Sequence, residues 1–174
     1  RILERSSGKR LEDAEFRPIV KAVLESLLDD YDIVDYSKNI SWSSAPEIRH
    51  QPDLIMVSKS RRRWIVVEVE LSHHILGYSY TSPLNRKSDH IYPQVEVFAE
   101  GIYEESHIEA LAEKLGEEFT SLRKLLFFPP EILVVGDNEE VIRTEEERLN
   151  WKRLEKDFEN VHLAFVETFK WRNN

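Results

Sequence analysis

The chain of 174 residues contains no cysteine and only five glycines. Without cysteine, disulfide bridges and thiolate zinc sites are excluded, and a reducing, cytoplasmic location is the expectation that fits. Five glycines leave little material for the Gly-rich loops that bind nucleotide phosphates. The six histidines show no His-x-x-x-His spacing of the kind that binds zinc.

Long hydrophobic runs are also missing, so we expect no membrane span and no signal peptide. Hydrophobic residues make up 41% of the chain and charged residues 33%, which is enough apolar material to bury one core. We therefore expect a single domain over residues 1–174. The sequence begins at Arg1 rather than Met, which leads us to expect a fragment of a larger protein.

The net charge of −9 disfavours a protein that coats nucleic acid nonspecifically, because such binding relies on many Lys and Arg contacts to phosphates. It does not exclude a nuclease, since local basic clusters are present. The candidate nucleic-acid contacts are Lys59, Arg61, Arg62, Arg63 and Lys87. The alternative for the cluster at residues 59–63 is a solvated turn, and for Lys87 it is surface solubility.

The segment 64–71 carries the most informative pattern in the chain. Alternation across a strand places Trp64, Val66, Glu68 and Glu70 on one face, with Ile65, Val67, Val69 and Leu71 on the other. The first face begins apolar and ends with two carboxylates. Such a pair resists burial unless a cation meets it.

The apolar segment 53–57 is the expected partner strand, and residues 58–63 are the turn between the two strands. A turn centred on Ser60 and Arg61 places Asp53 opposite Glu68 in an antiparallel pair. Two like charges facing each other are destabilising, so a divalent cation with oxygen ligands is the natural explanation. The alternative is a solvated end of a sheet whose acids keep an edge soluble.

These residues carry a resemblance to a known family. Pro52-Asp53, an interval of fourteen residues, and Glu68-Val69-Glu70 resemble the motif of the PD-(D/E)xK nuclease superfamily. The third position is usually Lys in that superfamily and is Glu in some restriction endonucleases. The resemblance covers residues 11–136 and implies an α/β fold with a restriction-endonuclease-like core, an αβββαβ mixed sheet flanked by helices.

Hydrophobic periodicity along the chain predicts elements in the same order. The expected helices are 13–28, 87–103, 109–126 and 144–158, with Pro18 and Pro93 near the starts of the first two. The expected strands are 32–36, 53–57, 64–71, 132–135 and 161–169. In the second helix the apolar face is Ile91, Val95, Phe98, Ala99 and Ile102.

The resemblance also implies a chemistry, the hydrolysis of phosphodiester bonds with Mg²⁺ or Mn²⁺, most readily assigned to DNA in restriction, repair or anti-phage defence. Asp53 and Glu68 would hold the metal, and Glu70 would accept a proton from the attacking water or help to bind a second metal. Loss of catalysis is the alternative at Glu70, because Glu cannot act as Lys does. A homodimer is a further implication of the resemblance.

Two helical residues complete the implied site. Glu15 resembles an acid that some superfamily members contribute from the first helix as an extra metal ligand; the alternative is a favourable interaction with the helix dipole. Gln94 resembles a polar residue that binds a phosphate or the metal-bound water; the alternative is an ordinary boundary residue.

Three hypotheses follow from the sequence. The chain is a metal-dependent nuclease, or a nuclease fold that has lost its chemistry and binds nucleic acid or protein, or an unrelated α/β interaction domain with solvated carboxylates. A fold alone does not separate them, because one fold hosts many functions.

Overall fold

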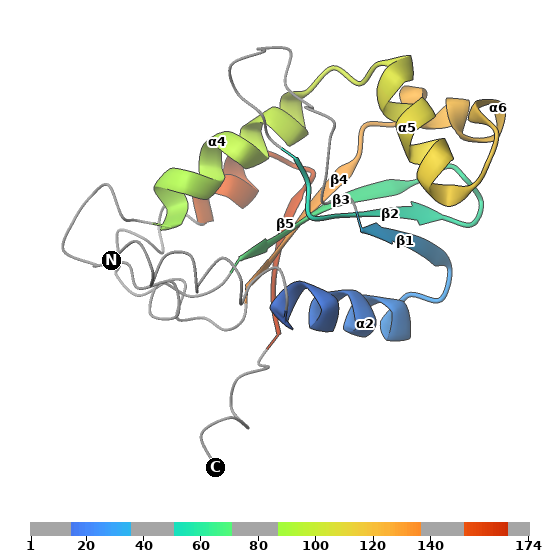
Figure 1. The fold of residues 1–174 in the computed structure, drawn as a ribbon. Coiled ribbons are helices and arrows are strands. Elements are labelled where there is room, and N and C mark those ends of the chain that lie inside the picture. The colour runs from blue at the N-terminus through green and yellow to red at the C-terminus, as the bar shows by residue number, and fades with distance from the viewer. Residues whose placement is uncertain (1–14, 36–50, 71–86, 137–151, 167–174) are drawn as a thin grey trace, which may run out of the picture.

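The computed structural model describes residues 15–35, 51–70, 87–136 and 152–166. They form a five-stranded mixed sheet in the order β1-β2-β3-β4-β5 (Figure 1). The first three strands are antiparallel neighbours, while β3, β4 and β5 are parallel. The strands are β1 (Tyr31–Asp35), β2 (Leu54–Ser58), β3 (Trp64–Glu70), β4 (Glu131–Gly136) and β5 (Val161–Phe165).

Helices flank both faces of this sheet, so the predicted α/β class is confirmed. Helix α2 (Arg17–Leu27) covers one face, and α4 (Lys87–Glu100) and α5 (Glu105–Leu115) lie on the other (Figure 1). Two short helices, α6 (Phe119–Leu122) and η3 (Arg123–Phe127), follow α5, and residues 152–157 are also helical. None of the described helices is long and apolar enough to cross a membrane.

The alternation predicted for β3 explains the two cores. Val67 and Val69 belong to a buried cluster with Phe16 and Val20 from the α2 side. On the opposite face, Trp64 and Val66 belong to a larger buried cluster. Its members from α4 and α5 are Ile91, Val95, Phe98, Ile108, Leu111 and Ala112. The period of two therefore sends every second side chain of one strand to each helical layer.

Several predicted boundaries need correction. The helix expected at 109–126 is wrong as one element, because α5 ends at Leu115 and Gly116 follows with φ +69° in the left-handed region that favours glycine. Pro93 was expected near the start of its helix and is instead the seventh residue of α4. Ile102 was expected on the buried face but lies beyond α4 and is 85% exposed.

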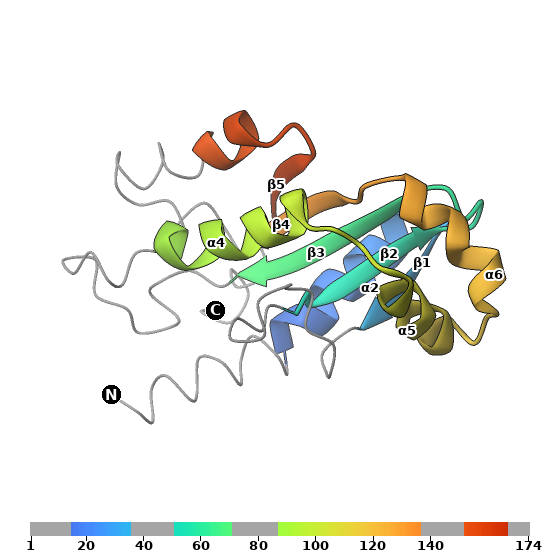
Figure 2. The same cartoon turned by 90° about the horizontal axis from the view of Figure 1, so that it is seen from above.

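Strand direction brings the acidic positions to one end of the sheet. Strands β1, β3, β4 and β5 all run the same way, since β1 and β3 each pair antiparallel with β2. Asp35 and Glu70 therefore end their strands where β2 begins, next to Asp53. Figure 2 shows α4 beside this carboxyl end of β3, while α5 and α6 lie near the opposite end.

Candidate functional site

The register of β2 and β3 is the one that the sequence predicted. Leu54 pairs with Val67, and Val57 pairs with Trp64, so the turn is centred between residues 60 and 61. Asp53 precedes Leu54 and Glu68 follows Val67, so both residues lie next to the last pair of the two strands. The Asp53 N–H donates to the Val67 carbonyl at 3.1 Å, which ties Asp53 to the end of β3.

Asp53 is held by contacts to two different elements. Its Oδ2 accepts a hydrogen bond from the Val69 N–H of β3 at 2.8 Å. Its Oδ1 lies 3.5 Å from Nη1 of Arg17, at the first residue of α2. The carboxylate is thus held at the sheet end by a backbone amide and a guanidinium.

Glu68 and Glu70 are both buried, with 2% and 8% of their surface exposed. They share the face of Trp64 and Val66, which is the face covered by α4. Nε2 of Gln94 on α4 donates to Oε2 of Glu68 at 3.3 Å. The structure therefore brings the predicted Gln94 to the predicted Glu68, and burial makes their contact stronger than it would be in water.

Arg17 is the site residue that the sequence interpretation missed. Its side chain is 12% exposed, and its Nε lies 3.9 Å from Oδ2 of Asp35 in addition to the Asp53 contact. A signal was present, because Arg17 lies between Phe16 and Val20 of the buried helical stripe, and a cation was needed near the acids. In this segment, the sequence analysis assigned a site role to Glu15 and none to Arg17.

The predicted three-ligand metal set is not assembled. Among the described residues, no group of three or more His, Cys, Asp and Glu side chains is placed to hold a metal ion. Glu15 is partly buried and precedes Arg17 by two residues, whereas the side chain of Lys87 lies outside the described residues. Asp53 and Glu68 remain as two carboxylates at the same end of the sheet, and hard oxygen donors of this kind fit Mg²⁺, which needs only one or two carboxylates.

The basic turn lies at the other end of the sheet. Six residue steps separate Trp64 from Glu70 along β3, which corresponds to about 20 Å. Arg63 pairs there with Glu131 at 2.7 Å, while Lys59 and Arg62 are exposed. The predicted nucleic-acid contacts of this turn are therefore remote from Asp53 and Glu68.

Arg61 has a structural task at this end. It lies 2.6 Å from Asp32 of β1 and also forms an ion pair with Glu117, beyond the end of α5. Burial lowers the pKa of Arg61, but hydrogen bonds to Glu117 and Asp32 outweigh it and leave the pKa raised. The hydrogen bond from Arg61 also lowers the pKa of Glu117. Arg61 therefore links the turn to β1 and to the segment after α5, and its guanidinium is already paired with two carboxylates.

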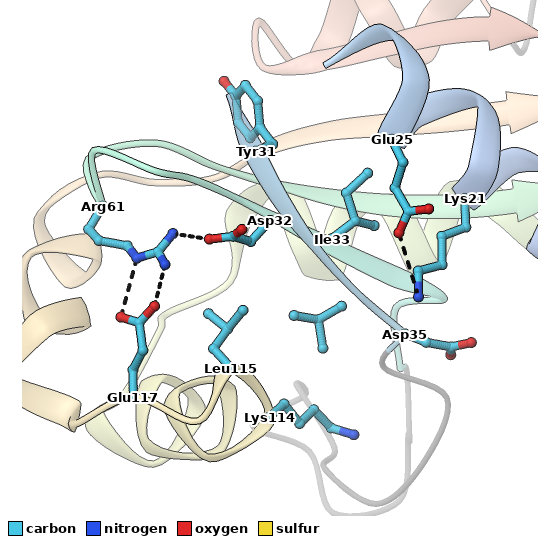
Figure 3. Close-up of a pocket in the computed structure, with 11 residues that line it drawn as sticks. Lys21, Glu25, Tyr31, Asp32, Ile33, Asp35, Arg61, Lys114, Leu115 and Glu117 are labelled. Atoms are coloured by element: carbon cyan, nitrogen blue, oxygen red, sulfur yellow. Dashed lines mark hydrogen bonds and ion pairs between the residues drawn. The ribbon is translucent and has the colours of Figure 1, made fainter. Parts of the chain in front are cut away.

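A cavity of about 770 Å³ runs along β1, between α2 and the end of α5 (Figure 3). Its charged lining consists of four carboxylates and three cations: Glu25, Asp32, Asp35, Glu117, Lys21, Arg61 and Lys114. The carboxylates outnumber the cations. Lys21 pairs with Glu25, and Arg61 pairs with Asp32 and Glu117. This balance does not favour binding of a phosphate backbone.

The geometry of this end of the sheet is the basis for assigning a function. The sheet end brings Asp53, Glu68 and Glu70 together with the Arg17 guanidinium, the Val69 N–H and the Gln94 amide. Comparison with protein-family models, with curated proteins and with solved structures finds no match to this chain.

Proposed function

We propose that this chain is a metal-dependent nuclease that hydrolyses phosphodiester bonds, with DNA as the favoured substrate. The observation that carries the proposal is the β2–β3 register, whose last pair is Leu54 with Val67, so that Asp53 and Glu68 both lie next to this pair at the end of the sheet where Glu70 ends β3. The order of α2, three antiparallel strands, α4 and β4 supports the resemblance to a restriction-endonuclease-like core.

In this proposal Asp53 and Glu68 hold Mg²⁺ or Mn²⁺. The bound ion would supply a water of lowered pKa and neutralise charge on the phosphate. The chain's own residues prepare that position: the Val69 N–H fixes Asp53, and the Gln94 amide fixes one oxygen of Glu68. Ligands held by such secondary hydrogen bonds need little reorganisation when the ion binds.

Glu70 takes the position that Lys occupies in the usual motif. It is buried at the end of β3, on the same face as Glu68. A carboxylate at this point is suited to accept the proton of the attacking water.

The testing experiment is cleavage of single- and double-stranded DNA and RNA with Mg²⁺, Mn²⁺ or EDTA. The native chain is compared with Asp53→Asn, Glu70→Gln and a matched control, Asp29→Asn, at an exposed position after α2. We expect metal-dependent cleavage by the native chain and the control, and its loss in the other two variants. A folded native chain without cleavage on all four substrates would contradict the proposal.

A second candidate is a nuclease fold that binds nucleic acid or protein without chemistry. The observation that favours it is that both oxygens of Asp53 already have partners, Arg17 and the Val69 N–H. Titration with Mn²⁺ separates the two candidates. Metal binding without cleavage supports the binding module, whereas metal-dependent cleavage excludes it.

A further inference from the structure

The cavity of about 770 Å³ along β1 lies at an open edge of the sheet (Figure 3). β1 comes first in the order β1-β2-β3-β4-β5, so β2 occupies one of its edges and no described strand lies along the other. Asp53, Glu68 and Glu70, the carboxylates of the proposed nuclease site, do not line this cavity. A ligand bound there is therefore a partner beyond the proposed function.

The residues that line the cavity place it beside β1 rather than over one of its faces. Ile33 packs against the core cluster on the α2 face, whereas Val34 belongs to the cluster on the α5 face. Both line the cavity, together with Lys21 of α2 and Leu115 of α5. Because α2 and α5 lie on opposite faces of the sheet (Figure 1), a space that borders both helices lies along the strand edge. The cavity is therefore a slot along the edge of β1, with one helix on each side.

The alternation of backbone hydrogen bonds in β1 is set where the strand begins. The Lys59 N–H donates to the Asp30 carbonyl at 2.8 Å. Asp30 and Lys59 directly flank the pair Tyr31 with Ser58, so this bond follows the register of β1 and β2. The backbone groups of Tyr31 therefore point away from β2, because hydrogen-bonded pairs recur only at every second residue. In agreement, the Tyr31 N–H donates to the Leu28 carbonyl at 3.1 Å.

Ile33 is the next residue of β1 whose backbone points outward. By the same alternation, Asp32 and Val34 form the hydrogen bonds to β2, whereas the N–H and C=O of Ile33 point into the slot. Within the described part of the chain, these two groups have no hydrogen-bond partner. A donor and an acceptor side by side on a strand edge are a template for the backbone of another strand.

We propose that this slot binds an extended peptide of a partner protein, which adds to the sheet as a further strand beside β1. The peptide runs antiparallel to β1 and exchanges two backbone hydrogen bonds with Ile33. The five residues of β1 give it a contact about 17 Å long. Main-chain hydrogen bonds supply the affinity of such a complex, and the spaces on either side select its side chains.

The lining of the slot favours a peptide with basic and aliphatic side chains. Four carboxylates and three cations line it, and Arg61 is already paired with two of those carboxylates. The excess of negative charge attracts a basic peptide and repels an acidic one. Ile33 and Leu115 offer apolar surface on the two sides of the strand, which suits aliphatic residues between the basic ones.

Amide hydrogen exchange of the whole chain, measured by NMR in EDTA without nucleic acid, tests the open edge. Ile33 and Val34 are neighbours in one strand, so each is a control for the other. In the free chain, the Ile33 N–H should exchange at least about tenfold faster than the Val34 N–H, which is bonded to β2. The probe is an acetylated seven-residue peptide in which Val and Lys alternate. Saturation with it should slow exchange at Ile33 at least about tenfold.

Two altered peptides separate backbone pairing from charge, with affinity measured by fluorescence anisotropy. One carries methyl groups on its three central backbone nitrogens and so loses the donors that would pair with β1. The other has Glu in place of every Lys. Each should bind at least about tenfold more weakly than the parent peptide, the first through lost hydrogen bonds and the second through repulsion.

Two variants of the chain test the same bond from the side of the protein. Ile33→Pro removes the outward N–H, and proline is tolerated on an edge strand at such a position. It should bind the parent peptide at least about tenfold more weakly, whereas Ile33→Val, which keeps the N–H, should stay within about twofold of native. Circular dichroism checks that both variants fold. If Ile33→Pro does not fold, the methylated peptide with the native chain tests this bond.

Three results would overturn the proposal. One is a native chain that binds the parent peptide no better than the methylated one. Another is slow exchange at Ile33 that increases with protein concentration in the free chain, which identifies a second copy of the chain as the occupant. The third is slow exchange at every concentration, which shows that a segment of the same chain covers the edge. The proposed nuclease function survives each of them, because cleavage is measured without peptide.

Discussion

The two ends of the sheet both place an arginine beside carboxylates, yet they do so differently. At the turn end, Arg61 contacts Asp32 at 2.6 Å and also pairs with Glu117, and the pKa of Glu117 is lowered by that bond. Both carboxylates are only partly buried, so their charges stay hydrated in part. The ion pairs of Arg61 with Asp32 and Glu117, called the clasp below, link the turn to β1 and to the segment after α5 and stabilise the fold.

At the carboxyl end of β3, two carboxylates are more deeply buried than those of the turn end. Glu68 and Glu70 have only 2% and 8% of their surface exposed, whereas the side chains of Asp32 and Glu117 are 36% and 24% exposed. Placing ionised groups there costs free energy that a hydrophobic residue would not. The comparison teaches that burial of the carboxylates, and not the presence of an arginine, distinguishes the carboxyl end from the turn end.

The largest expected effect comes from neutralising one carboxylate at each end. Glu68→Gln should lower cleavage by at least about a hundredfold, because it removes a proposed metal ligand. Its stability should be unchanged or higher by about 1 kcal/mol, since a buried charge is removed while the shape is kept. Glu117→Gln should leave cleavage within about twofold of native and lower stability by about 1 kcal/mol.

Urea denaturation and the cleavage assay measure the two effects on the same preparations. The comparison breaks if Glu117→Gln lowers cleavage as strongly as Glu68→Gln. It also breaks if Glu68→Gln cleaves normally, because the buried carboxylate would then have a purely structural role.

The sheet and its register could be predicted because they depend on local, periodic information. Alternation fixed the faces of β3, and the length of the turn fixed the register, in which Leu54 pairs with Val67 and Val57 with Trp64. The helical stripe likewise predicted α2, with Pro18 in its first turn. These properties depend on the order of residues within about ten positions.

The other features depend on contacts that sequence order does not reveal. Arg61 reaches Glu117 across 56 positions, and Arg17 reaches Asp53 across 36. Long side chains can extend in many directions, so their partners are set by the packing of whole elements. The break at Gly116 was missed because the apolar spacing continues past it while the backbone turns.

A smaller effect separates backbone strain from ion pairing at the turn. Arg61 has φ +57°, a left-handed conformation that a side chain adopts at a cost. Arg61→Ala and Arg61→Gly both lose the pairs with Asp32 and Glu117, about 1–2 kcal/mol together. We expect Arg61→Ala to be less stable than Arg61→Gly by about 1 kcal/mol, because only glycine adopts this φ freely.

Urea denaturation of both variants at neutral pH checks this order. Equal stability, or a less stable glycine variant, would show that the turn holds Arg61 without strain. Cleavage should be unchanged in both, since the turn is remote from Asp53.

The smallest effect is the pH dependence of the clasp. Because Arg61 lowers the pKa of Glu117 in the folded protein, ionised Glu117 stabilises the fold above its unfolded pKa of about 4.3. That stabilisation, about 1 kcal/mol or less, is lost as the pH falls through the lower folded pKa. Glu117→Gln lacks this stabilisation at every pH. The stability difference between native chain and variant should therefore shrink toward zero in acid.

Unfolding free energies of the native chain, Glu117→Gln and the control Glu109→Gln, measured by urea denaturation between neutral pH and about pH 3, test this convergence. Glu109 is exposed on α5, so its variant corrects for the loss of one negative charge. Parallel curves for the native chain and Glu117→Gln would show that the clasp gains nothing from ionised Glu117. If the stabilities of the native chain and Glu117→Gln converge in acid while metal-dependent cleavage is unaffected, the acid-sensitive stability lies at the turn end. Acid would then remove the ion pair of the turn end without any change at the carboxyl end.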